Sequence, residues 1–335
     1  TLVESIERRL HDVPGGAAYS VVLLVPALSV FLVQRYWVSR KNVVSVTGKP
    51  SGRAERITTP VLRIPILTIA VLTCTLVVIL YATVILGGFV NILGVNNEFT
   101  LDHYRFVLQG IGSDAMFTTT MLALIATPIA GLLGMLIAWL VVRKLKRSAG
   151  VLDFVAMLGL SVPGTVIGIG YAIAFNTPTI YGGRQWLPAV AGGSAMLGGA
   201  MAIVMVFVAR SIPTGLRSGV AALQQINPAI DEASTSLGAD SSQTFRKVTL
   251  PLIRPAFIAG LTYAFARSMT TLSPIVFITT PQTKIMTSQI LAEVDAGRFG
   301  NAFAYCAILV VIVLSFIGLI NLIAMHPALR GVQHR

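Results

Sequence analysis

The chain has 335 residues, of which 55% are hydrophobic and 11% are charged, and its net charge is +12. Apolar runs near or above the ~20 residues that cross a bilayer recur along it, which excludes an ordinary water-soluble domain and predicts an all-α, polytopic transmembrane bundle. Basic residues gathered on one membrane face explain the positive charge, so we expect a lipid bilayer and no nucleic acid as partner.

Seven transmembrane helices are predicted from the apolar windows. They cover residues 17–34, 64–90, 116–142, 151–175, 189–209, 255–280 and 302–325. Alternating them across the bilayer places 18 of the 25 Lys and Arg residues on one side and 6 on the other, with Arg267 inside the membrane. By the positive-inside rule we expect the basic side to be cytoplasmic, the N-terminus to lie outside and the C-terminus inside.

The first predicted helix is expected to be separate from the six that follow. An external start without a cleavable signal predicts that the protein continues upstream of residue 1. A faint repeat agrees, since three residues recur 286 positions later: Glu7, Ala18 and Tyr19. We therefore expect an external segment and the last helix of a preceding module at 1–37, a basic cytoplasmic linker at 38–63, and a six-helix module at 64–325.

Proline and glycine interrupt two of the predicted helices. Pro128 lies within the third helix, and Pro163 with Gly164 breaks the fourth in the stretch SVPGTVIGIG. Such breaks are tolerated where neighbouring helices or a watery cavity satisfy the freed backbone groups. Two interpretations stay open: these residues line a translocation path, or small residues such as Gly164 and Gly168 let helices pack closely.

Arg267 is the one clearly intramembrane charge of the predicted topology. Arginine at a bilayer centre costs about 2.5–3.5 kcal/mol on insertion scales, so its side chain should face the bundle interior or a wet cavity. Ser268 and Thr271 follow it and are candidates for the same path-lining face. Structural pairing of Arg267, and hydrogen bonds between helices for the two hydroxyls, are equally consistent with the pattern.

The predicted cytoplasmic loop at 211–253 contains signals for two short helices. Asn227 and Pro228 are typical of an N-cap and first helical residue, and Gly238 is typical of a left-handed stop. Asp240 and Gln243 then predict a capping box for a second helix. We expect a rigid projecting loop, although a loop that folds only over its own helices stays open.

Individual side chains of this loop carry further expectations. The apolar Ile230, Leu237 and Phe245 are predicted to dock the loop onto its own bundle or onto a partner, and Asp231 to lie on a solvated face. Pro251 is expected just beyond the end of the second helix.

A gapped motif in this loop carries a resemblance. Glu232-Ala233-Ser234, then Gly238, then Val-Thr-Leu-Pro ending at Pro251 resembles the Glu-Ala-Ala loop of permease subunits in binding-protein-dependent ATP-binding-cassette importers. In that family the loop seats in a groove on the ATP-binding subunit and passes its motion into the membrane helices. The resemblance implies that coupling depends on Glu232, Ala233, Gly238, Asp240, Leu250 and Pro251.

The resemblance also implies the partners of the chain. They are a dimer of ATP-binding subunits, a periplasmic substrate-binding protein and a second permease module, all at the bacterial inner membrane. Gly48-Lys49 is followed by proline and lacks a phosphate-binding loop, so ATP and Mg²⁺ are expected on the partner ATPase, with no cofactor in this chain. We expect a transport subunit, not an enzyme, and no resident metal, since the histidines are isolated.

Three further stretches resemble the ferric-iron subgroup of these permeases: residues 100–108, 162–175 and 265–280. Fused members of that subgroup carry two six-helix modules, and this chain is similar to the second. Ferric iron is therefore the expected cargo, with aminoethylphosphonate, polyamine or another small solute as alternatives. An ion-coupled secondary transporter would require midplane carboxylates, whereas Asp153 is the only acidic residue within the predicted helices.

Overall fold

The computed structural model describes residues 13–38, 59–109, 111–145, 147–181, 184–192, 195–227 and 229–325. Some predictions fall outside the described residues. They concern the segment before residue 13, most of the linker at 38–63, Pro228 and residues 326–335.

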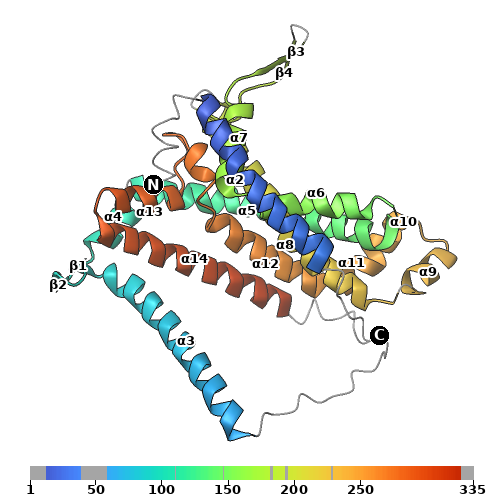
Figure 1. The fold of residues 1–335 in the computed structure, drawn as a ribbon, viewed down its shortest axis with the longest axis horizontal. Helices are drawn as coiled ribbons and strands as arrows, with labels where there is room; N and C mark the ends of the chain where they lie inside the picture. The colour runs from blue at the N-terminus through green and yellow to red at the C-terminus, as the bar shows by residue number, and fades with distance from the viewer. Residues whose placement is uncertain are drawn as a thin grey trace.

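Helices dominate the described chain, and Figure 1 shows their arrangement. The first half contains α2 (Val13–Val33), the π-helical turn η1 (Gln34–Val38), α3 (Pro60–Gly87), α4 (Asp102–Leu108), α5 (Ile111–Trp139), the π-helical turn η3 (Leu140–Lys144), α6 (Ala149–Ser161) and α7 (Gly164–Phe175). The second half contains η4 (Met196–Gly199), α8 (Ala200–Gln225), α9 (Ala229–Ser236), α10 (Ser241–Thr244), η5 (Phe245–Thr249), α11 (Leu250–Leu252), α12 (Arg254–Met269), η6 (Ile275–Phe277), α13 (Met286–Asp295) and α14 (Phe299–Met325).

Five described helices are long and apolar enough to cross a membrane, and the number rises to seven if each of two bent pairs forms one span. The bent pairs are α6 with α7, at 99°, and the segment Ser241–Leu252 with α12, at 78°. The predicted all-α membrane bundle is thus confirmed. Two short antiparallel hairpins in the connections were not predicted: β1 (Val90–Ile92) with β2 (Asn96–Phe99), and β3 (Thr179–Tyr181) with β4 (Arg184–Leu187).

The fifth predicted helix, at 189–209, is displaced in the structure, where α8 covers Ala200–Gln225. The predicted helix ended at residue 209, before the charged Arg210 and before Pro213. In the structure Pro213 is buried inside α8, where close packing on α5 and α12 maintains the helix through the proline. Residues 211–225 therefore belong to a long helix and not to a loop.

The sixth predicted helix, at 255–280, is also corrected, since α12 ends at Met269. Thr270 and Thr271 donate their hydroxyl hydrogens to carbonyls of the last turn, at 2.8 and 2.6 Å from Ala266 O and Arg267 O. Side-chain bonds of this kind compete with continued helix. The chain then turns through η6 into α13, which lies outside all of the predicted spans.

The core of the bundle lies between α5, α8, α12 and α14, which Figure 1 shows side by side. Phe207, Phe265 and Tyr305 fill its centre with almost no exposed surface. A second buried cluster, around Met135, Trp139 and other residues, lies toward the 226–253 loop. By contrast, the membrane-crossing part of α3 has no buried residue, and Figure 1 shows that helix standing apart from the bundle.

Small residues of the third predicted helix serve close packing. A Cβ on Gly131 would lie 2.5 Å from Leu261 of α12, and one on Gly134 would lie 2.9 Å from the Leu216 nitrogen of α8. Both contacts are shorter than a side chain allows: at Gly134 the backbones of α5 and α8 meet directly, and at Gly131 the Leu261 side chain of α12 packs on the α5 backbone. The packing interpretation is favoured at these positions.

A polar cluster joins α13 to α14 at the end of the bundle distant from the 226–253 loop. The buried Glu293 carboxylate accepts hydrogen bonds from Arg298 Nε at 2.7 Å and Arg298 Nη2 at 3.0 Å. Asn301 Nδ2 donates to the same carboxylate at 2.9 Å, and Asn301 Oδ1 lies 2.8 Å from His103 Nδ1. The hydrogen bond from Arg298 lowers the pKa of Glu293 from its ordinary value.

Replacing Glu293 by glutamine is expected to destabilise the protein by about 1–3 kcal/mol, because a buried charged acceptor is lost. A carboxyl group with a lowered pKa stabilises the fold above its unfolded-state pKa, and the stabilisation is lost as pH falls through the folded-state value. Melting temperatures of the purified membrane protein from pH 7 to pH 3 measure both effects. Glu98→Gln, at an exposed hairpin position, is the control, and an equal loss there would contradict the prediction.

Candidate functional site

The 226–253 loop contains two short helices joined at Gly238. Asn227 Oδ1 accepts the Ala229 N–H at 3.0 Å, Gly238 has φ +87°, and Asp240 Oδ1 accepts the Gln243 N–H at 2.7 Å. The predicted caps and left-handed stop are confirmed at these three positions. Pro251 was predicted just beyond the end of the second loop helix, and this prediction is wrong because the residue lies within α11. The π-helical turn η5 lets the chain continue there without a donor from the proline.

Arg143, at the end of η3, anchors this loop to the bundle. Its Nη2 donates to Leu223 O at 3.2 Å and to Ile226 O at 2.7 Å, carbonyls at the C-terminal end of α8. Its Nε forms an ion pair with Asp231 Oδ2 of α9 at 3.0 Å. The sequence analysis treated Arg143 only as one of the basic residues of a cytoplasmic segment. Its guanidinium group contacts three acceptors, and residue spacing along the sequence could not predict these contacts.

Asp231 was predicted on a solvated face, and this prediction is wrong. Its side chain is only 22% exposed, pairs with Arg143, and accepts a hydrogen bond from Thr249 Oγ1 at 3.2 Å. The physical reason is that α9 folds back against the end of η3, which the local helix pattern does not reveal. Asp231 therefore links the first loop helix both to the bundle and to the second loop helix.

Further contacts hold the two loop helices in place. Phe245 packs on Trp139 with 5.0 Å between ring centroids, so the loop docks on its own bundle there, as one predicted alternative states. Lys144 Nζ donates to Ser241 Oγ at 2.7 Å. The hydroxyl groups of Ser234 and Thr244 lie 3.0 Å apart and join α9 to α10. The loop is a rigid unit built on the end of α5 and η3.

The predicted coupling residues gather on the outer face of this unit. Leu250 is half-buried against the second core cluster, and the others are exposed: Glu232, Ala233, Gly238, Asp240 and Pro251. Leu237 is 89% exposed and Ile230 is 40% exposed, so neither docks on the bundle core. A projecting face with two uncovered apolar side chains is typical of a surface that binds another protein.

The second group of predicted residues lies at the break between α6 and α7. Pro163 precedes the first residue of α7, Gly164. A Cβ on Gly164 would lie 2.7 Å from Ser273 Cβ and 3.1 Å from Arg210 Nη1, and one on Gly168 would lie 2.6 Å from Pro274 O. The break thus packs against the chain that follows α12, which favours the packing interpretation of these glycines.

The polar residues around Arg267 make hydrogen bonds within and between helices. Ser268 Oγ donates to Ala264 O at 2.9 Å and lies 3.3 Å from Ser211 Oγ of α8. Thr271 Oγ1 donates to Arg267 O at 2.6 Å. Both hydroxyl groups are buried and bonded. The Ser268–Ser211 contact agrees with the alternative of helix-to-helix bonding, whereas Thr271 bonds to the preceding turn of its own chain segment.

The prediction that Arg267 is the one intramembrane charge is wrong. Arg210 lies within α8, inside the apolar span Leu197–Gln225, because that helix continues beyond the predicted boundary. Arg210 and Arg267 adjoin Ser211 and Ser268, whose hydroxyl oxygens lie 3.3 Å apart, and their like charges repel. Gly164 also lies beside Arg210, so this arginine of α8 has neighbours on both α7 and α12.

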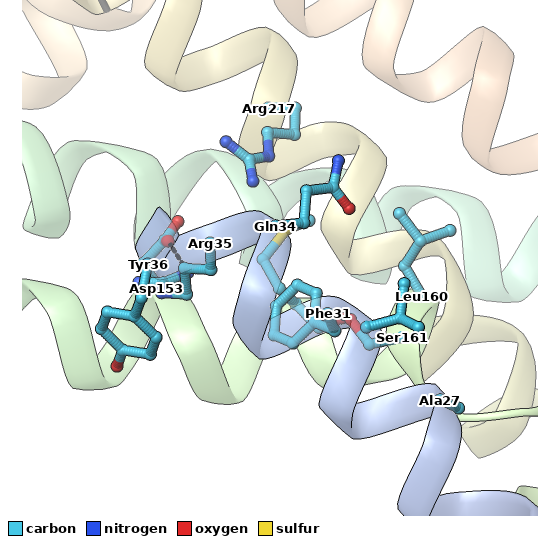
Figure 2. Close-up of a pocket in the computed structure, with 11 residues that line it drawn as sticks. Ala27, Phe31, Gln34, Arg35, Tyr36, Asp153, Leu160, Ser161 and Arg217 are labelled. Atoms are coloured by element: carbon cyan, nitrogen blue, oxygen red, sulfur yellow. Dashed lines mark hydrogen bonds and ion pairs between the residues drawn. The ribbon is translucent and has the colours of Figure 1, made fainter. Parts of the chain in front are cut away.

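A cavity of about 910 Å³ lies between α2, α6 and α8. Its charged end holds the Arg35–Asp153 ion pair, with 2.5 Å between Nη1 and Oδ2, and Arg217 and Gln34 line the same cavity (Figure 2). The other end is lined by apolar side chains such as Phe31 and Leu160. Asp153, the acidic residue of the predicted helices, is thus paired. Among the described residues, no group of three or more His, Cys, Asp or Glu is placed to hold a metal ion.

Comparison with known proteins identifies the family of this chain. The family model described as "Binding-protein-dependent transport system inner membrane component" matches residues 130–330, more than half of the chain. The chain belongs to that family. The resemblance inferred from the loop motif is thereby confirmed, and the protein is a multi-pass inner-membrane transport component.

Two characterised relatives show how far the similarity extends. The ferric transport system permease protein FbpB of Actinobacillus pleuropneumoniae is 34% identical over 311 residues, which cover 91% of this chain and 43% of that protein. The sulfate transport system permease protein CysT of Salmonella typhimurium is 28% identical over 219 residues, covering 64% of this chain and 78% of that protein. The chain therefore spans less than half the length of the ferric relative.

A solved structure of the same fold is a chain of a bacterial alginate ABC transporter, determined in complex with an alginate pentasaccharide-bound periplasmic protein. The TM-score is 0.60 at 16% sequence identity, and the match covers 79% of this chain and 96% of that chain. At this identity the likeness shows the fold alone. It places the membrane helices of this chain in the architecture of an ABC transporter permease.

Proposed function

We propose that this chain is the second transmembrane module of a permease in an ATP-driven importer, and that it carries ferric iron from a periplasmic binding protein into the cytoplasm. Alternating access of the broken helices would move the cargo. ATP and Mg²⁺ would bind a separate pair of ATP-binding subunits. In this arrangement the 226–253 loop and the C-terminus face the cytoplasm, as the distribution of basic residues predicts.

The observation that carries the proposal is the anchored loop with an exposed outer face. Arg143 and Asp231 fix its base, while Leu237, Ile230 and Glu232 lie uncovered at its surface. A flexible tether would not require such bonding, whereas a loop that transmits motion must resist deformation. An ATP-binding subunit seated on this face would bury the apolar side chains.

Similarity to a ferric permease supports the choice of cargo, and its length supports the two-module arrangement. The match covers 91% of this chain but 43% of that relative, which leaves room in the relative for another module of similar size. The exposed apolar surface of α3 supports a second module here as well, because α14 and β1 contact this helix but leave its most apolar stretch uncovered and available to another module.

Reconstituted uptake tests the proposal. The permease, co-expressed with the ATP-binding subunit and periplasmic protein from its own operon, should co-purify with the ATPase and take up ⁵⁵Fe³⁺ into proteoliposomes with ATP inside. Leu237→Asp should reduce both, while Leu93→Asp, at an exposed position of the β1–β2 hairpin, should not. Uptake of aminoethylphosphonate or a polyamine in place of iron would refute ferric iron as the cargo. A permease that never binds an ATPase would refute the ATP-driven mechanism.

A further inference from the structure

Arg210 and Arg267 are neighbours on α8 and α12, since the hydroxyl groups of the adjacent Ser211 and Ser268 lie 3.3 Å apart, and their like charges repel. Arg210 is half-buried, and its Nε and Nη1 are buried and have no hydrogen-bond partner in the described part of the chain. None of the ion pairs among the described residues includes either arginine. Buried guanidinium nitrogens without a partner are costly, and most such atoms in native proteins are hydrogen-bonded.

The positive end of a helix points to the same place. The 12-residue helix α7 begins at Gly164, and no side chain of the described residues caps its N-terminus. A Cβ on Gly164 would lie 3.1 Å from Arg210 Nη1, so the first turn of α7 lies directly against this guanidinium. Unpaired N–H groups at a helix N-terminus favour an anion. Arg210 thus has the N-terminus of α7 on one side and the like charge of Arg267 as a second neighbour, so three separate elements contribute positive charge around its side chain.

The helices that carry the arginines are fixed relative to each other beside this point. Ser211 and Ser268 each follow one of the arginines in sequence, and their hydroxyl oxygens lie 3.3 Å apart. Ser211 Oγ also donates to Ala264 O at 3.3 Å. These bonds prevent α8 and α12 from separating to relieve the repulsion between Arg210 and Arg267. The like charges are therefore held together by the fold.

We propose that Arg210, Arg267 and the N-terminus of α7 form a binding site for a small oxyanion of the phosphate or carboxylate class. The planar guanidinium of arginine presents paired donors that match the oxygens of such an anion, and backbone N–H groups bind its remaining oxygens. A bound oxyanion satisfies Arg210 Nε and Nη1 and offsets the repulsion between the two arginines. A carboxylate side chain of the second module is the competing partner, and the test below separates the two.

The consequence for transport rests on the proposed function. If ferric iron crosses near this site, two guanidinium groups would repel the bare trivalent ion. An oxyanion held between them removes that repulsion and supplies oxygen ligands, which suit a hard cation. The site itself does not depend on which cargo is carried, so its binding can be measured without transport.

The experiment titrates inorganic phosphate against the complete transporter in nanodiscs, with chloride adjusted to hold ionic strength constant. The melting temperature of the wild-type complex should rise with phosphate, since a ligand that binds only the folded state stabilises it. Arg210→Gln and Arg267→Gln should each weaken the apparent phosphate affinity about tenfold or more, the expected loss for about 1.4 kcal/mol. Arg210→Lys should retain part of it. The control is Arg105→Gln, whose side chain is 69% exposed on α4, and it should behave as wild type.

Each contrary result is distinct from a failure of the proposed function. Phosphate bound by the ATP-binding subunits is common to all variants, so equal shifts in wild type and Arg210→Gln would overturn the anion site. Absence of any phosphate-dependent shift in wild type would overturn it too. A structure of the full complex with a carboxylate of the second module bound to Arg210 would also overturn the anion site, because a protein side chain would then be the partner of this arginine. ATP-driven iron uptake that continues in any of these cases leaves the proposed function intact.

Discussion

Replacing Gly238 by valine is expected to abolish ATP-driven uptake while leaving the membrane bundle folded. Gly238 has φ +87°, a conformation that a β-branched residue adopts only with strain of about 1–3 kcal/mol. A Cβ there would meet nothing within 4 Å, so the cost is conformational and not a clash. Relief of that strain would change the angle between α9 and α10, and with it the fit of the exposed face to the ATP-binding subunit. Uptake and ATPase activity in proteoliposomes measure the loss, which should be about tenfold or more.

Two variants separate this effect from general instability. Gly94→Val introduces the same strain at φ +82°, also with nothing within 4 Å of the added Cβ, but in the β1–β2 hairpin. It should preserve uptake. Gly238→Asn should preserve most uptake, because asparagine tolerates the left-handed region. Wild-type uptake by Gly238→Val would show that the loop angle does not matter for coupling.

Replacing Arg143 by methionine is the second change with a large expected effect. It removes the ion pair with Asp231 and two hydrogen bonds to carbonyls at the end of α8, so the loop loses its attachment at three points. Hydrogen bonds that involve charged groups contribute about 1.5–3 kcal/mol each. We expect uptake to fall at least tenfold and ATP hydrolysis to become independent of the binding protein, because a loosened loop cannot pass motion into the helices.

A graded series tests the assignment of Arg143. Asp231→Asn removes only the ion pair and should have a smaller effect than Arg143→Met. Arg147→Met removes a nearby exposed arginine and should resemble wild type. Limited proteolysis of the loop gives a readout apart from activity. The rate of cleavage is expected to rise from Arg147→Met through Asp231→Asn to Arg143→Met, which should be cleaved fastest. Equal cleavage in all three would show that Arg143 does not hold the loop.

The local signals of the coupling loop were readable from sequence, and its long-range contacts were not. Asn227, Gly238 and Asp240 act on residues at most three positions away, so residue type and spacing were sufficient to predict their roles. The Arg143–Asp231 pair joins residues 88 positions apart, and nothing local distinguishes Asp231 from the adjacent Glu232. The helix pattern suggested Asp231 as the solvated residue, whereas in the structure Glu232 is the exposed one. Tertiary folding decided which carboxylate turned inward.

The same limit explains the errors in the membrane helices. Apolar windows located the helices of the bundle, yet the fifth predicted helix stopped at residue 209, whereas α8 continues to Gln225. Arg210 and Pro213 are compatible with α8 only because neighbouring helices surround them, and that information is absent from a one-dimensional window. The misplaced boundary also concealed the pair of Arg210 and Arg267. Consequently the sequence indicated Arg267 as the one intramembrane cation, whereas α8 carries Arg210 inside a span as well.

The sharp bend at Ile253 gives α12 the properties of a lever. This helix runs unbroken from Arg254 to Met269 through 16 residues, a length of about 24 Å, and carries Arg267 in its last turn. A tilt of about 5° about the near end would therefore displace the far end by roughly 2 Å, given that rise per residue. Small rotations of the 226–253 loop would be amplified into shifts comparable to a hydrogen-bond length. In the proposed transporter, a partner that moves this loop would thus shift Arg267 relative to Arg210 without contacting either residue.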